Sequence, residues 1–392
     1  MAQLSGVNIE KLQGGLLRGT AGTDNHVAYI VEMPEGVEST AVNNNGKGVV
    51  LKSAYDAQLL DINTAYDSNN NMKLYNQILE FFRLAPEATL YLFNSTTVAD
   101  IQSFINNNKD IKGYGINIAY DDVEPNLTST ISAHQIMINE LASQNRLIDF
   151  AMIGFDGLNT FDTDLFTMEA PQISVCVACE DNSGLVSVGS ALGMIAVRKI
   201  SENMGSVDIE NKPRDKRGTE NYTLTDPLFD RWLNAYITSG ETVSSLDKGI
   251  LKDMLDKGYI IVASYEGYAG FYFENSYTCI DRASDYAFIE NNRVWNHAAR
   301  TVRNTLLPRV KSKVKKDPVT GFIATTTVSY WTGLVNKALE QMIVNDDISG
   351  FEVNIDPSQV VNSTSPVRVQ AMVVADGIVH EFEVAVGLTN NI

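Results

Sequence analysis

Runs of apolar residues along the chain alternate between the spacing of strands and the spacing of helices. Short runs rich in β-branched residues at 27–31, 89–93 and 114–119 predict buried strands, and apolar positions at helical spacing predict helices at 72–84 and 128–142. Further strands are expected at 49–51, 148–153, 172–178 and 259–263, and further helices at 98–106, 189–203 and 243–256. Repeated strand–helix units of this kind predict a mostly parallel sheet flanked by helices.

The pattern changes after about residue 270, where we place a domain boundary. A long helical stretch begins near Asn291, and a second helix at 328–344 carries its apolar residues on one side. The chain closes with alternating apolar residues on both sides of Asp376-Gly377, which predict a β-hairpin. These features predict a separate α+β domain at the C-terminal end.

The two ends of the chain predict extended arms. A short alternating strand at 7–12 is followed by glycine-rich punctuation, and a strand of this length needs another sheet edge, in its own chain or in a neighbour's. We expect an N-terminal arm at 1–24 and an α/β core at 25–274. An α+β C-terminal domain follows at 275–392, and its last part, 366–392, is a hairpin arm.

The composition is that of a well-cored globular protein. Of the 392 residues, 44% are hydrophobic and 20% are charged, which excludes a disordered or low-complexity chain. The net charge of −18 argues against direct binding of nucleic acid. Three cysteines cannot form a disulfide framework. The first residues do not resemble a secretory signal, and no apolar run approaches the ~20 residues of a transmembrane helix, so we expect no membrane insertion.

Candidate catalytic groups are scattered along the chain. Cys176 and Cys179 lie in or at the end of a predicted strand, so we interpret them as buried apolar residues. Gly189 and Gly193 lack the Lys-Ser/Thr of a phosphate loop and are expected to let a helix lie close to the sheet. The histidines have no metal-ligand or triad partner nearby in sequence; they are His26, His134, His297 and His380. We therefore predict no enzyme, no metal site and no cofactor.

One charge signal is strong, a basic stretch between Arg293 and Lys316. It contains eight Lys and Arg and no Asp or Glu, which leaves −26 on the remaining 368 residues. At about 100° per residue, Arg293, Arg300, Arg303 and Lys311 project within one narrow arc of the predicted helix. Two interpretations stay open: a solvated helix face, or a docking face for an acidic partner surface.

A series of short motifs runs through the chain in a characteristic order. The C-terminal motifs are Arg293-Val-Trp-Asn-His-Ala-Ala-Arg300, Arg303-Asn-Thr-Leu-Leu-Pro308, the Thr320-Gly321 turn, Leu339-Glu-Gln-Met-Ile343, Ile348-Ser-Gly350 and Val353-Asn-Ile-Asp-Pro357. The upstream motifs are Gly6-Val-Asn-Ile, Ala170-Pro-Gln-Ile-Ser-Val175 and Val188-Gly-Ser-Ala-Leu-Gly193. Their order resembles that of contractile-tail sheath proteins from bacteriophages and related injection systems, in a short form without large surface insertions.

The resemblance implies a structural subunit. Sheath subunits polymerise helically around an inner tail tube and contract to drive that tube through a target envelope. They exchange N- and C-terminal strands with neighbouring copies, and baseplate and tail terminator proteins are their further partners. The implied location is a virion tail or an injection particle that is assembled in the bacterial host cytoplasm.

The resemblance also implies which residues make the contacts between proteins. The expected residues of the exchanged strands are Val7, Ile9, Leu12, Val367, Val369, Val373, Phe382, Val384 and Val386. The candidate tube-docking residues are Arg293, Arg300, Arg303, Lys311 and Lys337, from the basic stretch and from the helix at 328–344. The α/β alternation by itself leaves a second interpretation, a flavodoxin-like or doubly wound enzyme or nucleotide-binding protein.

Overall fold

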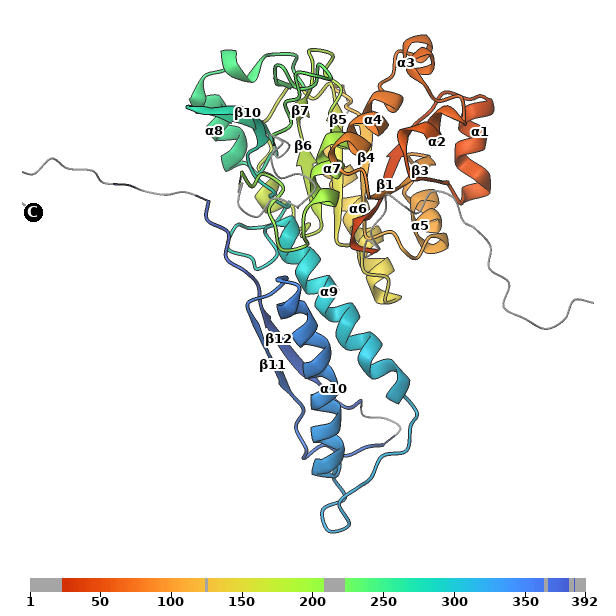
Figure 1. Cartoon of the computed structure of the whole chain (residues 1–392), viewed down its shortest axis with the longest axis vertical. Coiled ribbons are helices and arrows are strands. Elements are labelled where there is room, and N and C mark those ends of the chain that lie inside the picture. The colour runs from red at the N-terminus through yellow and green to blue at the C-terminus, as the bar shows by residue number, and fades with distance from the viewer. Residues whose placement is uncertain (1–22, 124–125, 208–222, 363–365, 381–383, 385–392) are drawn as a thin grey trace, which may run out of the picture.

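The protein consists of an α/β domain and an elongated stem that projects from it (Figure 1). The computed structural model describes residues 23–123, 126–207, 223–362, 366–380 and 384. Its largest sheet has the strand order β2-β3-β1-β4-β5-β6. These strands are β1 (His26–Val31), β2 (Val49–Leu51), β3 (Thr89–Asn94), β4 (Gly113–Ala119), β5 (Phe150–Asp156) and β6 (Ile173–Cys176). Neighbours are parallel except β2, which is antiparallel to β3, so the predicted mostly parallel sheet is confirmed.

Helices cover both faces of this sheet. On one face lie α4 (Leu74–Leu84) and α7 (Val188–Val197), and on the other lie α5 (Val98–Asn107) and α6 (Leu127–Ser143). Adjacent residues of β4 face opposite helix layers, because side chains alternate between the two faces of a sheet along a strand. The hydroxyl of Tyr114 lies 2.7 Å from Nδ1 of His134 in α6, whereas Gly115 faces the side chains of α7.

Close packing of α7 depends on glycines in two places. A Cβ at Gly189 would lie 2.4 Å from the carbonyl oxygen of Gln77, and one at Gly193 would also meet α4. The expectation that these two glycines bring the helix close to the sheet is therefore wrong, since they bring it close to another helix. The approach to the sheet depends on Gly115 and Gly154, where a Cβ would lie 2.5 and 2.7 Å from the side chains of Val188 and Val186.

Smaller elements complete the α/β domain. The further helices are α1 (Val37–Asn43), α2 (Ala54–Gln58), α3 (Thr64–Asn70) and α8 (Lys248–Asp256). Two small antiparallel sheets pair β7 (Ala178–Cys179) with β8 (Tyr236–Ile237), and β9 (Val262–Tyr265) with β10 (Tyr268–Phe273). Among the described residues, no helix combines the length and the apolar character needed to cross a bilayer.

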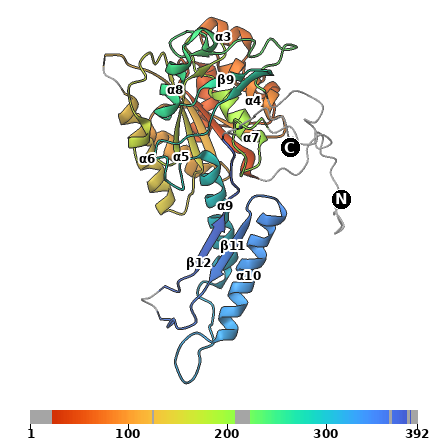
Figure 2. The same cartoon turned by 90° about the vertical axis from the view of Figure 1, so that its left-hand side faces the viewer.

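The stem is built from two long helices and a two-stranded sheet (Figure 2). Its elements are α9 (Ile289–Leu306), α10 (Thr325–Val344), β11 (Gly350–Asn354) and β12 (Gln370–Val374). Its larger apolar cluster joins Val294 and Ala298 of α9 to Val335, Leu339 and Met342 of α10. Because Ile289 belongs to the core of the α/β domain, α9 is shared between the two bodies.

Most of the second strand of the predicted C-terminal hairpin lies outside the described residues. Strand β12 pairs antiparallel with β11, in the register Gly350 to Val374 through Asn354 to Gln370. Of the residues after Gly377, the described residues 378–380 carry no strand. The alternating apolar pattern thus identified the first strand correctly, and the pairing of that strand with β11 was not predicted.

Candidate assembly site

Bonded side chains occupy the carboxyl edge of the large sheet, where doubly wound folds bind ligands beside the strand at which the order reverses. Tyr29 of β1 donates to Oδ1 of Asn117 in β4 at 3.0 Å, and Nδ2 of Asn117 donates to Oδ1 of Asp156 at 2.8 Å. The backbone N–H of Val186 donates to the same Asp156 oxygen at 2.7 Å. Burial raises the pKa of Asp156 to about 7. These three side chains are therefore bonded to one another within the protein.

A groove of about 950 Å³ lies beside α3 and α4. Three cations line it, and each already has a carboxylate partner. The pairs are Lys73–Asp181, Arg83–Glu80 and Arg231–Glu180. An anionic ligand would have to displace these carboxylates, so the arrangement favours a structural role for the cations.

The cysteines are placed as inert core residues. Cys176, Cys179 and Cys279 are buried free thiols, and burial raises the pKa of Cys176 to about 12. A thiol with so high a pKa is a poor nucleophile at neutral pH. The interpretation of Cys176 and Cys179 as buried residues is confirmed. Within the described ranges, no group of three or more His, Cys, Asp and Glu is placed to hold a metal ion.

Arg293 is placed inside the molecule. Its side chain is 2% exposed, and its guanidinium donates to the carbonyl oxygens of Lys199 and Arg198 at 3.1 and 3.4 Å. These carbonyls follow the C-terminal end of α7, where helix carbonyls lack intrahelical donors. The expectation that Arg293 presents its charge to a docking partner is corrected by this burial.

Arg300 and Asn296 connect α9 to the start of β5. Arg300 donates to both oxygens of Asp149, at 2.7 and 3.0 Å, and Asn296 donates to Oδ1 of Asp149 at 2.9 Å. Because Arg300 is engaged inside its own chain, it does not fit the predicted docking face either. Neither Asn296 nor Asp149 was predicted from the sequence, although Asn296 lies within the motif Arg293–Arg300 that carried the family resemblance. The polar residues of that motif fasten the stem to the α/β domain.

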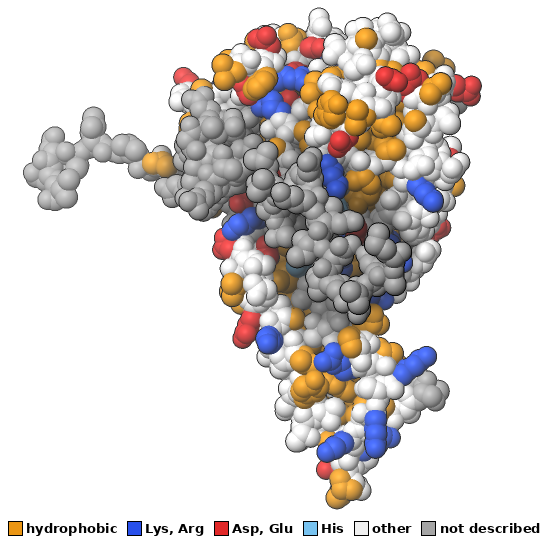
Figure 3. Space-filling view, turned by 45° about the vertical axis from the view of Figure 1, so that its right-hand side comes forward, with side chains coloured by type: hydrophobic (Ala, Val, Ile, Leu, Met, Phe, Trp, Pro, Cys, Tyr) orange, Lys and Arg blue, Asp and Glu red, His pale blue; other side chains and the backbone are white. Residues whose placement is uncertain are grey.

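The other predicted docking residues lie on the surface of the stem. Arg303, Lys311 and Lys337 are exposed. The loop after α9 presents four exposed lysines that we name the basic tip: Lys311, Lys313, Lys315 and Lys316. Figure 3 shows Lys and Arg gathered on the lower part of the stem. Residues 285–392 contain ten Lys and Arg and eleven Asp and Glu, so nearly all of the net negative charge lies on the rest of the chain.

The β11–β12 sheet is open at its edges. In the part of the chain that the structure describes, neither strand has a second strand beside it. One face packs on the stem helices through Val353 and Val373, and the other face exposes Met372 and Val374. An open edge has unpaired backbone N–H and C=O groups, so another strand can pair with it, and the apolar residues of the outer face favour such pairing.

The predicted donor residues fall into three groups. Val367 and Val369 pack against the cluster of Val328 and Trp331, and Val373 lies in β12, so these three residues belong to the stem of their own chain. Val384 is exposed. The remaining predicted donor residues lie outside the described residues; they are Val7, Ile9, Leu12, Phe382 and Val386.

Family models match nearly the whole chain. The model of the DUF2586 N-terminal domain matches residues 4–277, and the model of the DUF2586 C-terminal domain matches residues 285–392. The chain belongs to the DUF2586 family. Curated proteins offer no match to this DUF2586 chain.

Solved structures of contractile particles share the fold of this DUF2586 protein. A chain from the cryo-EM structure of the anti-feeding prophage (AFP) baseplate, 6-fold symmetrised, has a TM-score of 0.61 at 13% identity and covers 100% of both chains. A chain of the AFP baseplate in its contracted state has a TM-score of 0.53 at 12% identity, over 100% of this chain and 99% of that one. The sheath tail protein of Desulfitobacterium hafniense has a TM-score of 0.49 at 8% identity, over 94% and 99%. The resemblance to contractile-tail proteins is thereby confirmed at the level of the fold.

Proposed function

We propose that this DUF2586 chain is a structural subunit of a contractile tail sheath. Copies polymerise helically around an inner tube and contract to drive the tube through a target envelope. The observation that carries the proposal is the fold shared with an AFP baseplate chain over 100% of both chains. The bonded network of Tyr29, Asn117 and Asp156 supports a role other than ligand turnover, because it occupies the sheet edge that an enzyme of this topology would use.

Exchanged strands join the copies, and the β11–β12 sheet is their acceptor. Its open edges provide unpaired backbone groups, and Met372 and Val374 provide an apolar outer face. Residues 7–12 of one neighbour and residues 381–386 of another add to the two edges. The domain division at residue 275 stays a prediction.

The basic tip faces the inner tube. Four lysines at the end of a stem complement an acidic tube surface, while the strongly negative remainder of the chain is repelled by it. Arg303 and Lys337 add further exposed cations to the stem. Baseplate and terminator proteins then meet the two ends of the polymer, within a virion tail or an injection particle.

Electron microscopy of the purified chain tests assembly. The full chain is expected to form helical polymers. Variants that lack residues 1–22 or 381–392 should stay monomeric with unchanged circular dichroism, because both deletions keep Asp24 and β12. Met372→Glu should block assembly, whereas Val37→Glu, a control at another exposed apolar residue on the α/β domain, should not. A stable monomer of the full chain at high concentration would refute the proposal, and normal assembly of both truncated chains would refute strand exchange.

A further inference from the structure

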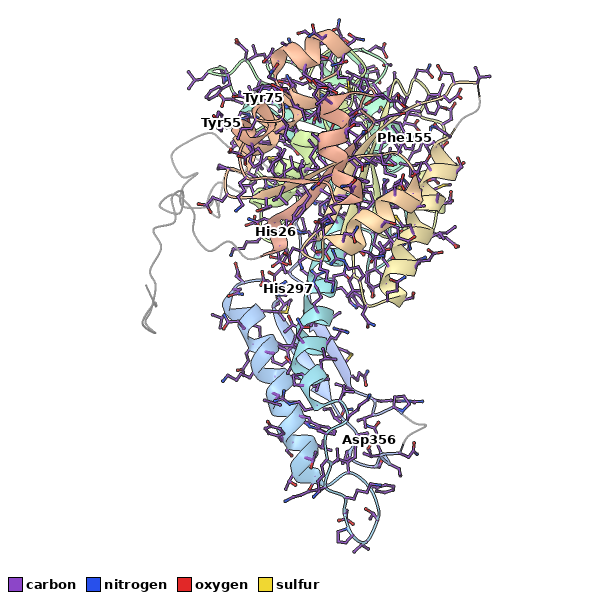
Figure 4. All side chains as sticks on the ribbon, turned by 90° about the vertical axis from the view of Figure 1, so that its right-hand side faces the viewer. His26, Tyr55, Tyr75, Phe155, His297 and Asp356 are labelled. Carbon is purple, nitrogen blue, oxygen red and sulfur yellow. The ribbon has the colours of Figure 1, made fainter. Side chains whose placement is uncertain are left out.

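The 3-10 helix before β1 contacts α9. Asp24 lies in the short 3-10 helix Thr23–Asn25, directly after residues 1–22 and directly before β1. Both of its carboxylate oxygens lie 3.2 Å from Nδ1 of His297. Figure 4 shows His297 on α9 at the junction between the α/β domain and the stem. The segment directly before β1 is therefore fastened to the helix that both bodies share.

The charges around this contact favour a protonated imidazole. The hydrogen bond with Asp24 raises the pKa of His297 above its ordinary 6.5, against the effects of burial and of the Arg300 charge. Burial alone would raise the pKa of Asp24, but the hydrogen bond and charge of His297 and the charge of Arg300 lower it to about 2. The other charged groups of this cluster are Asp149, Asp347, Arg293 and Lys112. Arg300 pairs with Asp149 at 2.7 Å and also lies 3.9 Å from Oδ1 of Asp24, so Asp24 has His297 in direct contact and Arg300 as a more distant second cation.

We propose that the Asp24–His297 contact is a proton-dependent clasp that holds the 3-10 helix Thr23–Asn25 against α9. The clasp is strongest while the imidazole carries two protons, and it weakens when the imidazole loses one of them. This inference concerns a contact within one chain and does not rest on the proposed function.

Proton linkage fixes the direction of the effect. A histidine whose pKa is raised in the folded protein contributes stability that is fully present below pH 6.5 and is lost as the pH rises through the folded pKa. The 3-10 helix Thr23–Asn25 is therefore held against α9 in weakly acidic solution and loosens as the solution becomes alkaline. By reciprocity, any partner that pulls Asp24 away from α9 also lowers the proton affinity of His297.

Hydrogen exchange measured by mass spectrometry tests the clasp on the full chain, whether monomeric or assembled. Exchange at the imidazole C2 position gives the pKa of each histidine. The expected value for His297 lies above 6.5, and Asp24→Asn should lower it by about half a unit or more. His134 is the internal control, because its partner is the neutral Tyr114, and its pKa should not respond to Asp24→Asn.

Backbone exchange in residues 24–28 gives the second readout. After correction for intrinsic rates, exchange in this segment should increase severalfold between pH 6 and pH 9 in the wild type. It should be independent of pH in Asp24→Asn and in His297→Gln, which keeps a donor but cannot carry the charge. A wild-type His297 pKa at or below 6.5, or a pH response equal in all three proteins, would overturn the clasp. The wild-type titration decides the question even where a variant fails to fold.

Discussion

Arg300 donates hydrogen bonds of 2.7 and 3.0 Å to the two carboxylate oxygens of Asp149, across the junction between the stem and the α/β domain. Asp149 is 1% exposed, and it also accepts a hydrogen bond from Asn296. Two residues that the sequence separates by 151 positions therefore form a bidentate, largely buried ion pair. The pair joins the stem to the α/β domain, beside the hydrogen bonds of Arg293 with Lys199 and Arg198.

Removing the cation of this pair should destabilise the protein strongly, because it leaves a buried carboxylate uncompensated. Arg300→Ala is expected to lower the free energy of unfolding by about 3 kcal/mol. Arg303→Ala is the matched control one turn further along α9, where the side chain is exposed, and it should change stability by less than about 0.5 kcal/mol. Chemical denaturation measures both. Equal losses in the two variants would show that the Arg300–Asp149 pair does not secure the junction.

Asp156 should make stability depend on pH. Its folded pKa of about 7 lies above its ordinary 3.8, so its contribution is fully present below pH 3.8 and is lost as the pH rises through 7. Asp156→Asn keeps an acceptor oxygen for Asn117 and Val186 but cannot ionise. We expect it to raise stability at pH 8 by on the order of 2 kcal/mol, with little gain at pH 4.

Thermal and urea unfolding between pH 4 and pH 8 would measure this dependence. Glu87→Gln removes an exposed carboxylate and serves as the control for the loss of one negative charge. A gain from Asp156→Asn that is the same at every pH would mean that the carboxyl does not titrate in this range.

Two glycines within helices should respond oppositely to alanine. At Gly189 the new Cβ would lie 2.4 Å from a backbone oxygen of α4, so we expect a loss of about 2 kcal/mol from overpacking. At Gly333 in α10 nothing lies within 4 Å, so alanine should raise stability by about 0.5 kcal/mol through helix propensity. The difference in unfolding midpoint between the two variants is the measurement. Similar midpoints would contradict the close contact between α7 and α4.

Charge reversal at the basic tip should weaken binding to the inner tube. Replacing Lys311, Lys313 and Lys315 by Glu is expected to abolish co-sedimentation with purified tube at moderate salt, because attraction becomes repulsion. Binding by the wild type should also fall as salt screens the contact. A variant with Glu at Lys47, Lys109 and Lys248, which are exposed on the α/β domain, carries the same change in charge and should bind normally. Equal behaviour of the two variants would remove the tip from the tube interface.

The α/β domain could be predicted largely from periodicity. A strand buried on both faces is apolar at nearly every position, and the run at 114–119 corresponds to β4. The helix predicted at 328–344 corresponds to α10, Thr325–Val344, because twenty residues show the helical period clearly. The short helices α1, α2 and α3 have at most seven residues each, too few to establish that period.

The pairing of β12 could not be predicted in this way. A turn signal such as Asp376-Gly377 is local, whereas pairing with β11 depends on a loop that closes between residues 354 and 370. In the structure Asp376 accepts a hydrogen bond from Ser349, just before β11. The Asp-Gly pair therefore follows a strand that pairs with β11.

Two of the five predicted docking residues, Arg293 and Arg300, are engaged within their own chain, and this too depends on the tertiary fold. A helical projection shows which residues share a side of a helix, but it does not show what covers that side. Arg293 and Arg303 project together, yet the first meets carbonyl oxygens from 94 and 95 positions earlier in the chain and the second meets solvent. Only the tertiary fold distinguishes a cation that binds its own backbone from one that is available to a partner.

Helix α9 passes without interruption from the α/β domain into the stem, with Ile289 in one apolar core and Ala298 in the other. Bending at the junction would break the hydrogen bonds of Arg293 and the ion pair of Arg300. The α/β domain and the stem therefore move together as one rigid body. In the proposed sheath, any shortening of the assembly therefore has to be accommodated at the contacts between copies.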